Sequence, residues 1–169
     1  SDHRPVEWKI WLEAVDIPEG LVINEVMQNP SAVPDIYGEW FELTNIGNTV
    51  ININGLVLKD NNSDYHSVVS DGGLVILPGD FLVLGREGDS NLNGGIELNY
   101  VYNNFNLGNT WDQIIIQHPT GLIIDEISYD NGETFPDPTG ASMMLVGSPE
   151  DNELGENWVS SSQSYGDGD

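Results

Sequence analysis

The spacing of short apolar runs constrains the fold of this chain more than any other feature. Runs of strand length alternate with Gly, Pro, Asn and Asp, and no segment of ten or more residues carries an apolar stripe at helical spacing. This pattern is typical of a β-sandwich or a β-barrel. We expect strands near residues 21–27, 39–45, 50–59, 73–77, 81–85, 98–103, 112–117, 122–129, 141–146 and 157–160.

Two of the connections can be assigned from their residues. In the segment 118–121 (His-Pro-Thr-Gly), proline at the second and glycine at the fourth position favour a type I turn. The order Pro78-Gly79 favours a type II turn, because glycine accepts the positive φ of the third position. Apolar runs flank both segments, so each is expected to connect two strands.

Charge is the most unusual property of the composition. Four Lys and Arg stand against 28 Asp and Glu, which gives a formal net charge of −24. The acids are scattered, which predicts a solvated, self-repelling surface. Such a surface repels polyanions, so we expect no direct binding of nucleic acid or of an anionic membrane leaflet without divalent cations.

Length and residue types set further limits. A chain of 169 residues suits one domain with one core. It contains no cysteine, which excludes disulfides and thiolate chemistry. No apolar run approaches the length that spans a bilayer, so we expect no transmembrane segment.

Several motifs follow one another in order: Leu21–Met27, Glu39–Asn45, Gly55–Asp60, Leu77–Leu84, Leu107–Ile116 and Thr120–Asp125. Their order and spacing resemble the lamin tail domain, the immunoglobulin-like module of nuclear lamins and of many secreted bacterial proteins. The resemblance implies an all-β, immunoglobulin-like sandwich of the lamin tail type. It also implies a setting beside hydrolase, nuclease or other extracellular domains, although a fold alone does not determine a function.

The two ends of the chain differ from its middle. Residues 1–20 predict an N-terminal extension, in which the alternation from Val6 to Ala14 favours one strand and residues 16–20 favour a linker. Residues 21–160 are expected to form the lamin-tail-like domain, and residues 161–169 are too polar to pack and predict a linker or tail.

The location of the protein is predicted from the same two ends. The Tyr-Gly-Asp-Gly-Asp ending resembles the start of a linker in secreted family members, so we expect a part of a longer protein. Residues 1–10 lack the pattern of a signal peptide. The protein is therefore either intracellular or has had its signal removed, and the resemblance favours an extracellular or cell-surface location.

The sequence gives no support for catalysis. His3, His66 and His118 stand far apart, and no metalloprotease, serine-hydrolase or phosphate-loop motif occurs. Glu39 and Glu42 are the best pair of carboxylates, but their odd spacing directs them to opposite faces of a strand. We expect a surface or loop-anchoring role for them, and no enzyme activity.

One segment has the ligand spacing of a calcium loop. Asp89, Asn91 and Asn93 occupy the first, third and fifth positions and Glu97 the ninth, with the backbone carbonyl of Gly95 as a further oxygen. The twelfth position is Tyr100 where a bidentate Glu is usual, and the flanks predict strands. The alternative is that these Asp and Asn side chains form Asx turns. Weaker candidates of the same kind are residues 60–64 and 130–133.

The tryptophans offer a second possible contact surface. Trp40 and Trp111 lie in predicted strands, where core packing is expected. Trp8 and Trp11 have odd spacing, so one of them is expected to point outward, where it would stack on a sugar or contact a partner.

Together these observations predict a non-catalytic accessory module of a larger secreted or cell-surface bacterial protein. Its expected partners are a protein, a surface glycan or neighbouring domains of a longer chain. Two alternatives stay open: a calcium-dependent carbohydrate-binding or adhesion module, and the non-catalytic part of an extracellular nuclease. EDTA-sensitive glycan binding would distinguish the first alternative.

Overall fold

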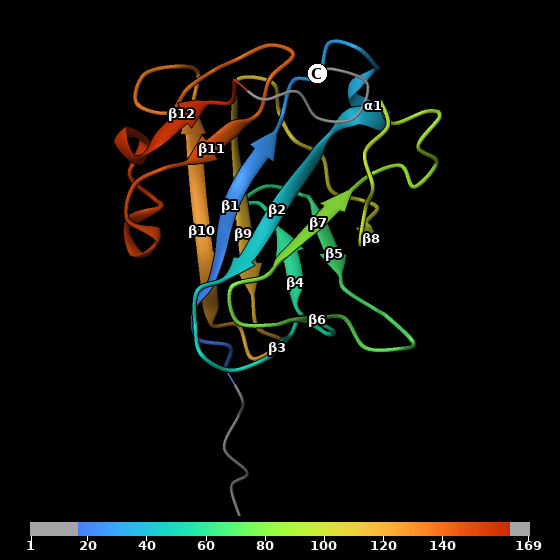
Figure 1. The fold of residues 1–169 in the computed structure, drawn as a ribbon, viewed down its shortest axis with the longest axis vertical. Coiled ribbons are helices and arrows are strands. Elements are labelled where there is room, and N and C mark those ends of the chain that lie inside the picture. The colour runs from blue at the N-terminus through green and yellow to red at the C-terminus, as the bar shows by residue number, and fades with distance from the viewer. Residues whose placement is uncertain (1–16, 163–169) are drawn as a thin grey trace, which may run out of the picture.

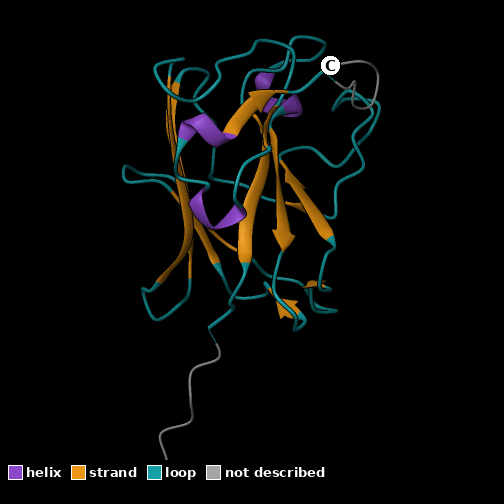
Figure 2. Ribbon diagram, turned by 60° about the vertical axis from the view of Figure 1, so that its left-hand side comes forward, coloured by secondary structure: helices purple, strands orange, loops and turns teal. Residues whose placement is uncertain are grey.

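A computed structural model describes residues 17–162, which form two facing β-sheets with little helix. Figure 1 shows β1, β2 and β7 crossing in front of β9, β4 and β5, and Figure 2 separates the two layers. The fold prediction of an all-β, immunoglobulin-like sandwich is confirmed. The strand predicted between Val6 and Ala14 lies outside the described residues.

The larger sheet has the order β12-β11-β1-β2-β7-β8 and is antiparallel except between β7 and β8. Its strands are β1 (Leu21–Met27), β2 (Trp40–Asn45), β7 (Phe81–Gly85), β8 (Tyr100–Val101), β11 (Met143–Leu145) and β12 (Trp158–Ser160).

The second sheet has the order β10-β9-β4-β5 and is antiparallel throughout. Its strands are β4 (Val57–Lys59), β5 (Tyr65–Ser67), β9 (Trp111–Gln117) and β10 (Ile123–Asp130). A two-stranded sheet pairs β3 (Ile51–Asn52) with β6 (Val75–Ile76). The helical segments are α1 (Asp35–Gly38), η1 (Pro149–Asp151) and η2 (Gly155–Asn157).

The core lies between the two sheets and is filled by strand residues and by residues of the loops that connect the strands. Phe41, Tyr102 and Phe105 form its aromatic centre, with ring centroids 5.7 Å apart for Phe41–Tyr102 and 5.5 Å apart for Tyr102–Phe105. Each fully buried apolar side chain of this kind contributes about 1.5–3 kcal/mol relative to exposure. In β9 and β10 the core residues follow the two-residue period of a strand, at Ile114 and Ile116 and at Ile127 and Tyr129.

Two β-bulges interrupt that period on facing strands. In β1 the register shifts between Ile23 and Glu25, so that Ile23 and Val26, three positions apart, both reach the core. In β10 the register shifts between Ile123 and Asp125. A bulge bends its strand and redirects the neighbouring side chains. The two bulges bring β1 and β10 into contact at Ile23 and Asp125.

The prediction of a single strand over residues 50–59 was wrong. It is divided into β3 and β4 by a turn in which the N–H of Leu56 donates to Ile53 O at 3.1 Å. Gly55 has a φ of +90° in this turn, a conformation that side-chain-bearing residues rarely adopt. The strand β5 was not predicted, because its three residues lie in a polar segment and are defined only by pairing with β4.

Both predicted turns are present. The N–H of Asp80 donates to Leu77 O at 2.9 Å, and Gly79 has the positive φ (+81°) that a type II turn requires. The N–H of Gly121 donates to His118 O at 2.8 Å, which closes the connection from β9 to β10.

The tryptophan predictions had different outcomes. Trp40 is buried with Met27 and Ile96 in a second small cluster, as expected. The prediction for Trp111 was wrong, since 55% of the residue is exposed. In β9 the inward positions are Ile114 and Ile116, so the odd-numbered Trp111 faces away from the core. Trp8 and Trp11 lie outside the described residues.

Candidate functional site: a groove between β1 and β10

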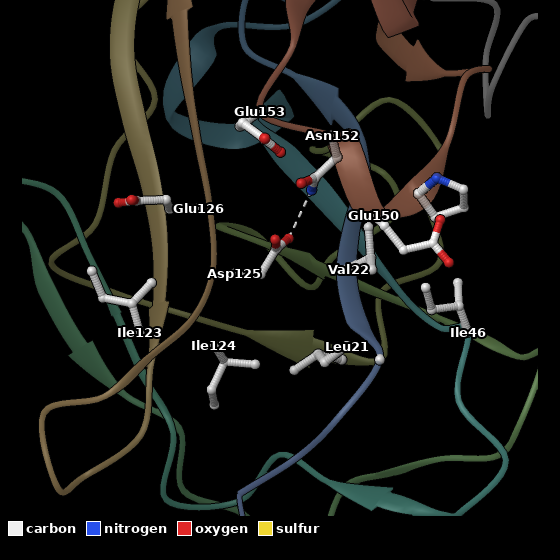
Figure 3. Close-up of a pocket in the computed structure, with 12 residues that line it drawn as sticks. Leu21, Val22, Ile46, Ile123, Ile124, Asp125, Glu126, Glu150, Asn152 and Glu153 are labelled. Carbon is white, nitrogen blue, oxygen red and sulfur yellow. Dashed lines mark hydrogen bonds between the residues drawn. The ribbon is translucent and has the colours of Figure 1, made fainter.

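A cavity of about 510 Å³ opens between the beginnings of β1 and β10. We call it the β1–β10 groove; η1 and the residues after it border its third side (Figure 3). Its lining consists of Gly20, Leu21, Val22, Ile46, Ile123, Ile124, Asp125, Glu126, Pro149, Glu150, Asn152 and Glu153.

Two strand edges without a partner strand border this groove. β11 pairs with β1 only at Glu25 and Val26, so the edge at residues 21–23 has no paired strand among residues 17–162. β10 pairs with β9 on one side only and is the outermost strand of its sheet in the described chain. Unpaired edges expose N–H and C=O groups that can bind an extended chain.

Side chains take the place of a strand at Ile23. The N–H of Ile23 donates to Asp125 Oδ2 at 2.7 Å, and Ile23 O accepts from Asn152 Nδ2 at 3.2 Å. Asn152 Nδ2 also donates to Asp125 Oδ2 at 2.8 Å, drawn as the dashed line in Figure 3. The indole N–H of Trp158 donates to Asn152 O at 2.7 Å and fixes this segment. Asp125 and Asn152 therefore join the two sheets at the groove.

The backbone of Leu21 faces the same side as that of Ile23. In an extended strand the N–H and C=O of alternate residues point to the same edge. The N–H of Ile46 donates to Gly20 O, so Gly20 and Val22 face β2, whereas Leu21 and Ile23 face the groove. The groove side of Leu21 has no β-ladder partner in the described part of the chain.

The electrostatics of the groove are governed by carboxylates. Burial raises the pKa of Asp125 to about 6, although hydrogen bonds from the Ile23 N–H and the Asn152 amide lower it, and the charge of Glu153 raises it further. Glu126, Glu150 and Glu153 are exposed around the opening. None of the 12 lining residues is Lys, Arg or His. The site is an apolar floor under an acidic rim.

This arrangement suits binding better than catalysis. The lining contains no Ser, Thr, Cys, Lys or His, so carboxylates are its only side chains of a type that acts as a nucleophile. Asp125 accepts hydrogen bonds from two donors that fix the fold, which leaves it poorly placed to transfer protons.

Sequence reasoning missed this groove, although one signal pointed to it. Asp125 stands in phase with Ile127 and Tyr129, both buried in the core, so a carboxylate occupies an inward position of β10. The partners Ile23 and Asn152 lie 102 and 27 positions away, and no local pattern connects them.

The structure places the predicted calcium loop in a surface turn after β7. Asp89 Oδ1 accepts from the backbone N–H of Asn91 at 2.9 Å and from its side-chain amide at 2.8 Å. These bonds lower the pKa of Asp89. Asn93 is buried; its amide donates to Glu87 O and Ile96 O, and its oxygen accepts from the Ile96 N–H.

These contacts match the Asx-turn alternative, and the weaker candidates behave similarly. Asp60 Oδ1 accepts from the N–H groups of Asn62 and Asp64, and the Asp130 carboxylate accepts from Thr134 and Phe135. Within residues 17–162, no three His, Cys, Asp or Glu side chains cluster closely enough to hold a metal ion. Calcium binding by Asp89, Asn91, Asn93, Gly95 and Glu97 stays a prediction.

The loop-anchoring role predicted for Glu39 is present in the structure, but the residue is buried. Its Oε2 lies 2.9 Å from Arg86 Nη1 and accepts from the Leu107 N–H at 3.1 Å. Burial raises the pKa of Glu39 to about 7, while the bonds from Leu107 and Arg86 lower it. Glu42 is also buried, and its Oε1 accepts from Asn24 Nδ2 at 2.8 Å. The two carboxylates therefore have separate partners.

The fold defines the class of protein as an immunoglobulin-like β-sandwich. The family description Lamin Tail Domain matches residues 17–131, and the chain belongs to this family. Comparison with curated protein sequences and with solved structures gave no match. No helix among the described residues is long and apolar enough to cross a membrane.

Proposed function

We propose that the chain is a non-catalytic binding module of a larger secreted or cell-surface bacterial protein, and that the β1–β10 groove is its binding surface. The observation that carries the proposal is the pair of unpaired strand edges over an apolar floor. Immunoglobulin-like sandwiches of the lamin tail family are non-catalytic, which supports the same conclusion. Concave sites with apolar floors and a few polar groups are typical ligand sites.

The test measures binding of the fluorescently labelled chain to intact cells of the organism that produces it. We expect saturable binding that falls about tenfold in the variant Ile46→Asn/Ile123→Asn, because both exposed apolar side chains line the groove. The matched control is Val69→Asn/Val101→Asn, which removes two exposed apolar side chains elsewhere. Equal binding by the two double variants would contradict the groove as the binding surface.

A second candidate, carbohydrate binding, is favoured by the exposed Trp111. This indole lies beside Gln113 and Ser128 in a shallow cavity of about 310 Å³, and Gln113 Nε2 donates to Ser128 Oγ at 2.7 Å. An exposed aromatic ring among polar side chains is suited to stack on a sugar. Trp111→Ala would abolish cell binding under this candidate and leave it unchanged if the groove is the site.

A further inference from the structure

The β1–β10 groove has chemistry that specifies a ligand class, and this step rests on the function proposed above. We propose that the groove binds an extended segment of a partner protein that carries a lysine or arginine side chain. Three features of the groove lead to this class: its strand edges, its apolar floor and its charge.

The strand edges provide backbone hydrogen bonds. Leu21 faces the groove in phase with Ile23, whose N–H and C=O are bound by Asp125 and Asn152. An extended segment beside Leu21 continues this line of hydrogen bonds toward the start of β1. Adding a strand to an exposed edge gives affinity through the main chain and specificity through alternate side chains.

The floor receives apolar side chains of such a segment. Leu21 lies beside Ile124 on one side of β1, and Val22 lies toward Ile46 on the other (Figure 3). Exposed fractions of 39% for Ile46 and 45% for Ile123 leave apolar surface for a ligand to cover. None of the 12 lining residues is aromatic, which disfavours a sugar as the occupant.

The charge of the groove favours a cationic ligand. Asp125, Glu126, Glu150 and Glu153 line it without a basic neighbour. In the described part of the chain the Lys and Arg residues are Lys59 and Arg86, and neither lines the groove. The net charge of −24 adds a long-range field that attracts basic segments.

The experiment begins with a display library of random linear peptides of about ten residues, long enough to pass through the groove. The whole chain is the target, in EDTA, so that divalent cations are removed. We expect enriched peptides to carry Lys or Arg next to alternating Val, Ile or Thr. The most enriched peptide is then synthesised, with a partner peptide in which norleucine replaces the basic residue.

Calorimetry with these two peptides measures the charge requirement. We expect Glu126→Gln/Glu153→Gln to weaken binding at least about tenfold, because this double variant removes two of the four negative charges that line the groove. The control Glu97→Gln/Glu133→Gln removes the same charge from two exposed positions outside the groove and should change affinity less than about twofold. The norleucine peptide should bind the wild type more weakly, by a factor similar to that by which Glu126→Gln/Glu153→Gln weakens binding of the basic peptide.

Amide shifts of the isotope-labelled chain locate the peptide and separate the outcomes. Shifts at Leu21 and Asp125 with a peptide that needs no basic residue would overturn the cation requirement and leave the proposed function intact. Shifts confined to other parts of the molecule would overturn the groove itself, and with it the proposed function. If Arg4→Gln/Lys9→Gln moves the Leu21 and Asp125 signals of the free chain, residues 1–16 occupy the groove and the external partner is overturned.

Discussion

Glu39 and Asp125 are two carboxylates that folding removes from water in different ways. Glu39 is 3% exposed and is neutralised by Arg86 of the same chain. Within residues 17–162 the donors to Asp125 are neutral, and Glu153 opposes its ionisation. Burial raises both pKa values, to about 7 for Glu39 and about 6 for Asp125.

The difference between the two sites is whether the described part of the protein provides a positive charge for the carboxylate. At Glu39 the chain supplies the counter-ion, so the carboxylate ties β2 to the end of β7 and to the loop at Leu107. At Asp125 no Lys or Arg of residues 17–162 supplies one, and the site is open to solvent. Glu39 serves the fold alone, whereas Asp125 joins the sheets and keeps a charge that the proposed ligand would balance.

The largest expected effect comes from removing the internal anchor. Glu39→Ala leaves the Arg86 guanidinium without its carboxylate and the buried Leu107 N–H without an acceptor. Breaking a buried ion pair in this way costs about 3–5 kcal/mol. Urea unfolding measures the change, with Glu97→Ala as a control expected to stay within about 0.5 kcal/mol. A cost below about 1 kcal/mol for Glu39→Ala would show that the anchor contributes little.

The second prediction concerns pH. The folded-state pKa values of Glu39 and Asp125 lie above their ordinary values of 4.5 and 3.8. The folded state therefore binds protons more tightly than the unfolded state, and this stability is present below about pH 4. It is lost as pH rises through about 6 for Asp125 and about 7 for Glu39.

The size of this loss is about 3 kcal/mol at Glu39 and at most about 3 kcal/mol at the less buried Asp125. Urea unfolding at constant ionic strength should show a free energy of unfolding that decreases from pH 5 to pH 8. Asp125→Asn should remove the part of the slope that ends near pH 6, whereas Glu97→Gln should not. A free energy that increases with pH over this range would contradict both pKa directions.

The third prediction isolates the contact between the sheets at the groove. Asp125→Ala leaves the Ile23 N–H and the Asn152 amide without their shared acceptor, at a cost of about 1–3 kcal/mol. A double-mutant cycle with Asn152→Ala should show coupling, because the two side chains form one network. Additive costs would indicate that Asp125 acts on Ile23 alone. A cost equal to that of Glu39→Ala would remove the distinction between the two carboxylates.

The fold was largely predictable because its signals are local. The apolar runs that became β1, β7 and β9 are confined to single segments, and Pro78-Gly79 specifies its turn through the φ of one glycine. The errors arose where pairing decides the outcome: Gly55 divides one apolar run into two strands, and β5 exists only beside β4. Trp111 is exposed because Ile114 and Ile116 occupy the inward positions of β9, which directs Trp111 to the opposite face.

The groove was much harder to predict than the fold. It forms where Ile23, Asp125 and Asn152 meet, and a bulge in each strand sets that meeting. Bulges insert one residue into a ladder and have no reliable local pattern. The sequence showed one feature of the groove, namely that Asp125 occupies an inward position of its strand. The calcium motif, in contrast, is easy to recognise from its spacing. Its Asp and Asn residues also form turns readily, so the spacing alone does not distinguish a calcium site from an Asx turn.

The smallest expected effect is that of calcium on the loop at Asp89, which offers a third kind of carboxylate, fully exposed and bound to its own turn. A calcium ion there would replace the hydrogen bonds from Asn91, so the affinity should be weak, about 10⁻⁴ to 10⁻³ M. At ten times that dissociation constant, binding to the folded state alone should raise Tm by about 4 °C. Thermal melting with calcium against EDTA, at matched ionic strength, measures this for the wild type and Asp89→Ala. A specific site gives a rise in Tm that the variant loses. An equal rise in both proteins, or a rise that magnesium reproduces, means that the ion only screens the net charge. The loop is then a plain Asx turn.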